Sequence, residues 1–398
     1  MADRPGIGTR AVHTPPAPTP AQAPLGLPVW RTAAWAFGSA QEYSDLLNGR
    51  MAGYSYSRIA NPTTDAFGTA VASLEDVTGE ALGWACASGM AAVTTTIIAL
   101  AGGGHVVAPR EVYGGTYGLL DVLGPRLGVT VSWVDARDPD AVAAAITADT
   151  RLVWGEVLAN PTISVADLPA LAAVAHAAGV PLAVDATFAS PVVCRPLEHG
   201  VDVVVHSATK YLGGHGDVTA GVVVARPELL HEIATVGITM GPSLSPDDAF
   251  LAHRGLATLP LRVRQQCATA TALAAALAEH PAVVKVEHPS LPGTADHDLA
   301  RKLFDDGLYG AMLTVTVPGG TDGAADYCDA AGLALIASSL GSHHTKLTPV
   351  ATTTHRQLSA EALARAGIAG GAVRISCGLE DTEDVVADLV GALRAVSR

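Results

Sequence analysis

One lysine stands where a buried strand would open into a glycine-rich loop. The segment His206-Ser207-Ala208-Thr209-Lys210 follows an apolar run, and the whole chain of 398 residues contains only four lysines. Arginine cannot lose its proton, so a lysine kept at this place suggests a Schiff-base nucleophile that also carries protons. The local sequence leaves a solvated loop lysine as an equal alternative.

A carboxylate ends a second apolar run, Leu182 to Asp185, upstream of this lysine. Ligands of parallel sheets bind outside the carboxyl ends of the strands, so Asp185 and Lys210 should face one crevice. A carboxylate there can keep a pyridine nitrogen protonated, which turns the ring into an electron sink. The alternative for Asp185 is a helix N-cap.

Ser88-Gly89-Met90 joins a predicted strand to a predicted helix. The free amide groups of a helix N-terminus bind phosphate, although such a segment is more often a plain turn. Together the lysine, the carboxylate and the phosphate site predict a pyridoxal 5'-phosphate (PLP) enzyme.

Alternating strands and helices must position these residues. Continuous apolar runs, typical of strands covered on both faces, predict a mostly parallel α/β sheet. The expected strands are 81–85, 105–108, 129–134, 151–157, 182–185, 201–206 and 220–225. The expected helices are 62–74, 90–100, 139–146 and 167–178, followed after a break at 237–248 by one long helix, 248–280.

Three regions follow from this pattern. The proline-rich stretch 14–28 cannot form a helix or a central strand, which predicts an N-terminal arm over 1–60. We expect a large PLP-binding domain over 61–246 and a smaller C-terminal α/β domain over 247–398.

Composition excludes several classes of protein. A net charge of −14 argues against nucleic acid or an anionic membrane as a partner. The absence of a ~20-residue apolar run and of an apolar signal core predicts a cytoplasmic protein. The five cysteines are scattered and never in CxxC spacing, so we expect neither disulfides nor a metal site.

A set of short motifs spans nearly the whole chain. They are Thr9–His13, Tyr54–Arg58, Asn61–Thr63, Tyr113–Thr116, Glu156 with Asn160–Thr162, Ser207–Asp217, Arg254–Leu256, Ser339–Gly341 and Arg374–Asp381. Together these motifs resemble the Cys/Met-metabolism family of PLP enzymes, which includes methionine γ-lyase, cystathionine γ-lyase, cystathionine γ-synthase and homoserine-ester sulfhydrylases. The resemblance implies a type I aminotransferase-like fold and a homotetramer, built as a dimer of dimers with shared active sites. It also implies that the substrate is a small amino acid.

The resemblance also implies roles for individual residues. Lys210 would form the Schiff base, Asp185 would pair with the pyridine nitrogen, and Tyr113 would stack on the ring and transfer protons. Asn160 would contact the 3'-oxygen of the cofactor. Tyr56 and Arg58 would contact the cofactor phosphate of the neighbouring subunit. The residues that would hold the phosphate of their own chain's cofactor are Gly89, Met90, Ser207 and Thr209.

On the substrate side, the resemblance implies that Arg374 and Ser339 hold the α-carboxylate. Ser55 and His344 occupy positions where cystathionine-handling members carry acids that suit a distal ammonium group. Losing both acids indicates a leaving group without that ammonium, because a partly buried charge needs a partner. Alternatively, His344 could attract an anionic leaving group.

Other departures concern the type of reaction. Gly115 stands where methionine γ-lyases carry a reactive cysteine, whereas the loop 215–221 is most similar to theirs. Ala186 replaces the usual asparagine beside Asp185. The first hypothesis is γ-elimination of a small, uncharged leaving group, giving a vinylglycine-derived product or a 2-oxo acid and ammonia. The alternatives are γ-replacement by a thiol or carbon nucleophile, and a non-catalytic PLP-fold binding protein.

Overall fold

The structure, a computed structural model, describes residues 23–356, 361, 363 and 367–396, so the motif at residues 9–13 lies outside the described residues. A seven-stranded sheet has the order β1-β7-β6-β5-β4-β2-β3, and only β7 runs antiparallel to its neighbours. This confirms the expected α/β fold with a mostly parallel sheet. The strands are β1 (Leu82–Cys86), β2 (His105–Pro109), β3 (Thr130–Val134), β4 (Thr150–Glu156), β5 (Leu182–Asp185), β6 (Val203–Ser207) and β7 (Gly221–Ala225).

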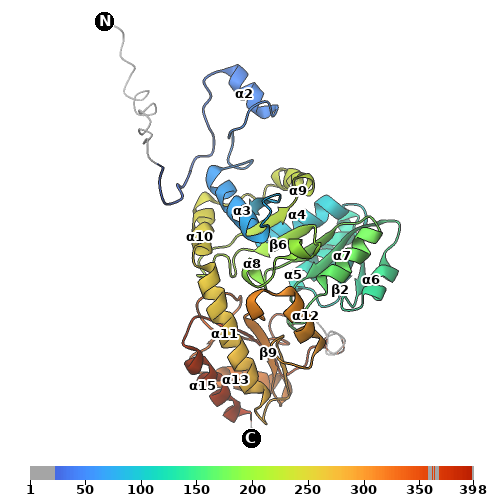
Figure 1. Cartoon of the computed structure of the whole chain (residues 1–398), viewed down its shortest axis with the longest axis vertical. Helices are drawn as coiled ribbons and strands as arrows, with labels where there is room; N and C mark the ends of the chain where they lie inside the picture. The colour runs from blue at the N-terminus through green and yellow to red at the C-terminus, as the bar shows by residue number, and fades with distance from the viewer. Residues whose placement is uncertain (1–22, 357–360, 362, 364–366, 397–398) are drawn as a thin grey trace.

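Helices cover both faces of this sheet (Figure 1). In β6, Val204 packs into the cluster on one face, while Val203 and Val205 pack into the cluster on the other. Both faces of the sheet are buried, which explains why its strands are rich in consecutive apolar residues. The helices of this part are α3 (Pro62–Glu75), α4 (Gly89–Ala101), α5 (Gly114–Gly118), η1 (Leu119–Leu123), η2 (Gly124–Leu127), α6 (Pro139–Ala145), α7 (Leu168–Ala177), α8 (Ser190–Val193), η3 (Pro196–His199) and α9 (Pro227–Met240).

A second sheet of five strands has the order β10-β11-β12-β9-β8. Alternate residues of β11 and β12, such as Leu347 and Ile375, belong to the core between this sheet and its helices. Its strands are β8 (Lys285–Glu287), β9 (Met312–Thr316), β10 (Leu335–Ile336), β11 (Lys346–Pro349) and β12 (Ala372–Ser376). The helices packed against it are α13 (Gly320–Ala330), α15 (Thr382–Ala392) and η5 (Leu393–Ala395). In the same part of the chain, α12 (Ala295–Leu303) packs into a core cluster of the large sheet, and η4 (Asp305–Gly307) contacts α8.

Two helices connect the sheets where the sequence predicted a single helix over 248–280. They are α10 (Pro246–Leu256) and α11 (Leu259–Ala278), and α10 packs against α3 of the large sheet. Pro260 lies in the first turn of α11, where its missing N–H costs nothing, but it cannot continue α10. The single-helix prediction was therefore wrong.

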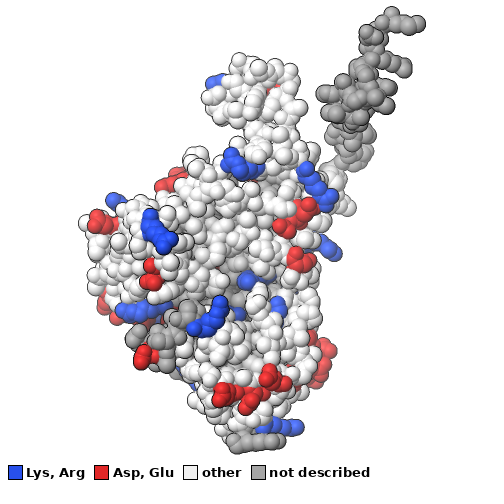
Figure 2. All heavy atoms as spheres, turned by 180° about the vertical axis from the view of Figure 1, so that it is seen from behind, with Lys and Arg blue, Asp and Glu red and all other residues white. Residues whose placement is uncertain are grey.

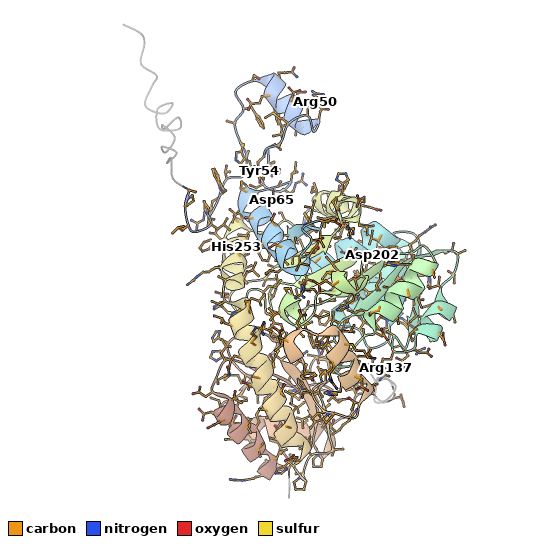
Figure 3. The ribbon with its side chains drawn as sticks, viewed as in Figure 1. Arg50, Tyr54, Asp65, Arg137, Asp202 and His253 are labelled. Atoms are coloured by element: carbon orange, nitrogen blue, oxygen red, sulfur yellow. The ribbon has the colours of Figure 1, made fainter. Side chains whose placement is uncertain are left out.

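The described part of the N-terminal arm extends away from the body and carries helix α2 (Ala40–Leu47) (Figure 1). At its base, Tyr54 lies beside Asp65 of α3 (Figure 3), and burial together with that carboxylate raises the pKa of Tyr54. Arg31 pairs with Asp247 at 2.6 Å. Within the described residues, no helix is both long and apolar enough to span a membrane.

Candidate active site

A cavity of about 360 Å³ lies between the two sheets. Its floor comes from the carboxyl ends of β4, β5 and β6 and from the start of α4. Its opposite wall comes from the loop 338–340 and from β12. Figure 2 shows Lys and Arg atoms within a hollow on the face opposite to that of Figure 1. The expected crevice at the strand ends therefore exists.

Lys210 points into this cavity from the turn after β6. Its Nζ donates a hydrogen bond to Ser339 Oγ at 2.8 Å. Burial, together with the positive charges of Arg374 and Lys346, lowers the pKa of the amine to about 8, against an opposing effect of Asp185. Lys210 is thus no solvated loop lysine, and its amine loses its proton at a lower pH than that of a free lysine.

Asp185 lies at the end of β5 and also lines the cavity. Its Oδ1 accepts a hydrogen bond from the backbone N–H of Thr187 at 2.9 Å. Burial raises the pKa of the carboxyl group, while Thr187, His206 and Lys210 lower it. The following helix, α8, is capped by Ala189 instead, so the N-cap alternative for Asp185 was wrong.

The start of α4 forms a cradle next to β6. Ser88 caps the helix by accepting from the N–H of Ala91, while Gly89, Met90 and Ser207 line the cavity. A Cβ added to Gly89 would lie 2.5 Å from the Cβ of Ser207, so only glycine fits here. This surface of small residues and free amides suits a phosphate.

Arg374 faces the cavity from β12, with only 4% of its surface exposed. It donates to Asn160 Oδ1 at 2.9 Å and to Ser339 O at 3.4 Å, and its Cζ lies 5.9 Å from the centroid of Phe188. Burial lowers its pKa to about 10. No carboxylate of the described residues forms an ion pair with it, which leaves the guanidinium available for a ligand carboxylate.

The remaining predicted residues divide into two groups. Tyr113 and Asn160 line the cavity, and Tyr113 is 46% exposed. Thr209 does not line it, because its hydroxyl bonds to the backbone of Ala220. The others outside this lining are Tyr56, Arg58, Ser55 and His344.

Tyr56 and Arg58 lie in the arm, where the Arg58 Cζ is 5.7 Å from the Tyr56 ring and its Nη1 donates to Ile238 O at 2.6 Å. His344 lies at the surface, with its Nδ1 4.0 Å from Glu380 Oε1 and its ring 4.2 Å from that of His343. Within a single chain these residues therefore do not meet Lys210.

Sequence reasoning assigned no role to eight residues that line the cavity. They are Val93, Glu156, Leu158, Thr187, Phe188, Ser338, Leu340 and Thr354. Glu156 was recognised only as part of a motif. Its position at the end of β4, next to β5, was the available signal, because strand ends carry ligand contacts.

The residues present fit PLP. The Gly89 cradle suits the phosphate, Asp185 the pyridine nitrogen and Lys210 the aldehyde, all around one cavity. The described residues contain no cluster of His, Cys, Asp and Glu able to hold a metal ion.

Comparison with known proteins gives the same picture. A family model described as "Cys/Met metabolism PLP-dependent enzyme" matches residues 8–394. The chain is 40% identical to L-methionine gamma-lyase of Porphyromonas gingivalis, over 97% of this chain and 96% of that protein. It is 38% identical to O-succinylhomoserine sulfhydrylase of Pseudomonas aeruginosa, over 93% and 91%.

A solved structure shares the fold. It is the putative O-acetylhomoserine (thiol)-lyase of Campylobacter jejuni, which contains N'-pyridoxyl-lysine-5'-monophosphate. The TM-score is 0.90 at 30% identity, covering 95% of this chain and 97% of that one. The predicted type I fold is thereby confirmed.

Proposed function

The chain belongs to the Cys/Met metabolism family of PLP-dependent enzymes, and from this premise we propose that it catalyses γ-elimination on a small amino acid. The observation that carries the proposal is the convergence of Lys210, Asp185 and Arg374 on one cavity. The leaving group at Cγ would carry no ammonium, and small uncharged groups are the first class to test. The products would be a vinylglycine-derived compound, or a 2-oxo acid and ammonia.

Arg374 would hold the substrate α-carboxylate by a bidentate contact, helped by Ser339. This orients the Cα–H bond toward Lys210, whose Nζ lies 2.8 Å from Ser339 Oγ. When bound, PLP supplies the electron sink that makes Cα and then Cβ acidic. The neutral amine of Lys210 would remove the Cα proton and pass it on to the bound cofactor. Neutral again, the amine would then take a Cβ proton, and its pKa of about 8 favours this neutral form.

Tyr113 would donate a proton to the departing group at Cγ. It lines the cavity beside Met90, and it stays partly exposed, so it can reach both the cofactor and the substrate. Asn160 would contact the 3'-oxygen of the cofactor, while its Oδ1 accepts from Arg374 and so links the two binding sites.

We further propose a cytoplasmic homotetramer, a dimer of dimers, in which Tyr56 and Arg58 bind the cofactor phosphate of the neighbouring subunit. The exposed arm supports this, because Tyr56 is 45% exposed and neither residue lines its own chain's cavity. Ser55 lies in the same segment and would border the neighbour's substrate. Thr209 would support the phosphate site from its bonds to Ala220.

The second candidate is γ-replacement, in which a thiol or carbon nucleophile adds at Cγ. The similarity to O-succinylhomoserine sulfhydrylase favours this candidate as specifically as the lyase similarity favours elimination. A non-catalytic binding protein is disfavoured. The amine of Lys210 has a lowered pKa and shares the cavity with Arg374, which would bind the substrate carboxylate, and such perturbed groups are typical of catalytic sites.

A product screen tests the proposal. The PLP-loaded protein is incubated with O-acetyl-, O-succinyl- and halo-homoserine, methionine and cystathionine, with and without a thiol. We expect 2-oxobutyrate and ammonia without the thiol. Coupled product that forms only with the thiol would favour the replacement candidate, and no turnover of any substrate would refute both.

A further inference from the structure

Glu156 is a buried carboxyl group in the wall of the cavity to which the proposed reaction gives no task. It ends β4, and in the sheet it lies directly beside Asp185, the last residue of β5. Residues in register on neighbouring strands present their side chains to the same face. The cavity floor therefore carries two neighbouring acids.

The hydrogen bonds of Glu156 go to backbone. Its Oε1 accepts from the N–H of Tyr113 at 2.7 Å, and the N–H of Asn160 also donates to the carboxyl group. Tyr113 is the N-cap of α5 and has no side-chain capping bond of its own. Glu156 thus fixes the backbone of the residue that would stack on the cofactor.

Glu156 is buried and forms no ion pair within the part of the chain that the structure describes. Only 8% of its surface is exposed, and Lys210 and Arg374, which line the same cavity, are hydrogen-bonded to Ser339 and Asn160 instead. Asp185 is better stabilised as an anion, because Thr187 bonds to it and both His206 and Lys210 lower its pKa. Burial and the charge of Asp185 raise the pKa of Glu156 well above its usual range.

We propose that Glu156 is a positioning residue, a neutral carboxyl group that anchors the Tyr113 backbone and leaves Asp185 as the one ionised acid of this pair. Two adjacent carboxylates in a dry site cannot both ionise cheaply, so the pair divides the roles. A neutral Glu156 keeps the full charge of Asp185 for the pyridine nitrogen. The inference rests on the PLP binding of the proposed function but not on its substrate.

The test uses three variants of the full chain. Glu156→Gln keeps a neutral acceptor, Glu156→Leu removes the acceptor, and Glu279→Gln is a matched control at an exposed position outside the cavity. Cofactor affinity is measured by titrating each apo-protein with PLP and following absorbance. Infrared spectra of wild type minus Glu156→Gln, taken at neutral pH, report the protonation state of the carboxyl group.

We expect Glu156→Gln to bind PLP within about threefold of wild type, and Glu156→Leu to bind about ten- to hundredfold more weakly because the Tyr113 N–H loses its partner. The infrared difference should contain the carbonyl band of a protonated carboxylic acid. A Gln variant as weak as the Leu variant would overturn the proposal, and so would a missing band. Wild-type affinity in Glu156→Leu would overturn the anchoring of Tyr113.

If Glu156→Leu does not fold, the Gln variant and the infrared band still decide. No readout involves turnover, so a failed product screen and a failed Glu156 inference are separate results.

Discussion

The Nζ of Lys210 lies 2.8 Å from the Oγ of Ser339, a residue 129 positions further along the chain. Ser339 adopts a left-handed φ of 72°, which is uncommon outside glycine and costs about 1 kcal/mol or more. Two positions on, Gly341 has a φ of 70°, and a Cβ there would lie 2.8 Å from the N of Tyr211. The tight loop around Ser339 and Gly341 holds the Ser339 hydroxyl against the Lys210 amine. This loop belongs to the part of the chain that carries the five-stranded sheet, so that part helps to form the environment of the amine.

The rate of PLP capture by the apo-protein should follow the neutral form of Lys210. Its pKa is lowered to about 8, so the rate should rise with pH through a midpoint there. Lys346→Met removes a like charge that lowers this pKa, so the midpoint should move to higher pH. Stopped-flow absorbance checks both. A wild-type midpoint near that of a free lysine, or no shift in the variant, would contradict the prediction.

Gly89→Ala should weaken cofactor binding strongly. The new Cβ would lie 2.5 Å from the Ser207 Cβ and 2.7 Å from its Oγ, so the phosphate cradle must open. We expect PLP binding to be about five- to hundredfold weaker, since overpacking costs about 1–3 kcal/mol. Gly118→Ala is the control, because its Cβ meets nothing within 4 Å. Equal PLP affinities of the Gly89→Ala and Gly118→Ala variants would show that the cradle at Gly89 does not bind the cofactor phosphate.

Much of this site could be predicted from the sequence, because its parts lie where buried strands end. Val203–Val205 and Leu182–Val184 are continuous apolar runs, so the ends of β6 and β5 could be located, and Lys210 and Asp185 do line one cavity. Glu156 was missed because its partner is a backbone N–H of Tyr113, and no residue type encodes such a contact. Pro260 indicates the break between α10 and α11, but the helical pattern on both sides of it led to the prediction of one continuous helix.

Mixed subunits should show whether active sites are shared. Arg58→Ala and Lys210→Ala should each be inactive, whereas subunit exchange between them should restore activity. A hybrid dimer would contain one intact site, since Arg58 serves the neighbour. At random exchange about a quarter of wild-type activity is expected, because half of the dimers would be hybrids with one working site each. Verified exchange without any activity would show that each chain completes its own site.

Cystathionine should be a poor substrate relative to an analogue with an uncharged leaving group. Without an acid at 55 or 344, its distal ammonium lacks a partner, at a cost of about 1–3 kcal/mol or roughly ten- to hundredfold in kcat/KM.

His344→Glu should shift preference toward cystathionine, and more so together with Ser55→Glu. In the single variant the new carboxylate would stand near Glu380, whose Oε1 lies 4.0 Å from His344 Nδ1, and the two negative charges would repel each other. The double variant adds a further carboxylate at position 55, so it should show the larger effect. If wild type cleaves cystathionine as fast as uncharged analogues, the missing acids do not set specificity. If His344 instead attracts anionic leaving groups, His344→Ala should slow those substrates selectively.

Residues from both sheets line the cavity, and two hydrogen bonds cross it. Lys210 bonds to Ser339 and Arg374 bonds to Asn160, across 129 and 214 positions of the chain. A ligand that fills the cavity therefore stabilises the arrangement in which the two sheets are packed together, relative to any partly opened form. This stabilising free energy grows with the concentration of free ligand. Partly opened chains are the ones that proteases cut. The supply of vitamin-derived cofactor in the cell would then govern the lifetime of the polypeptide as well as its chemical competence.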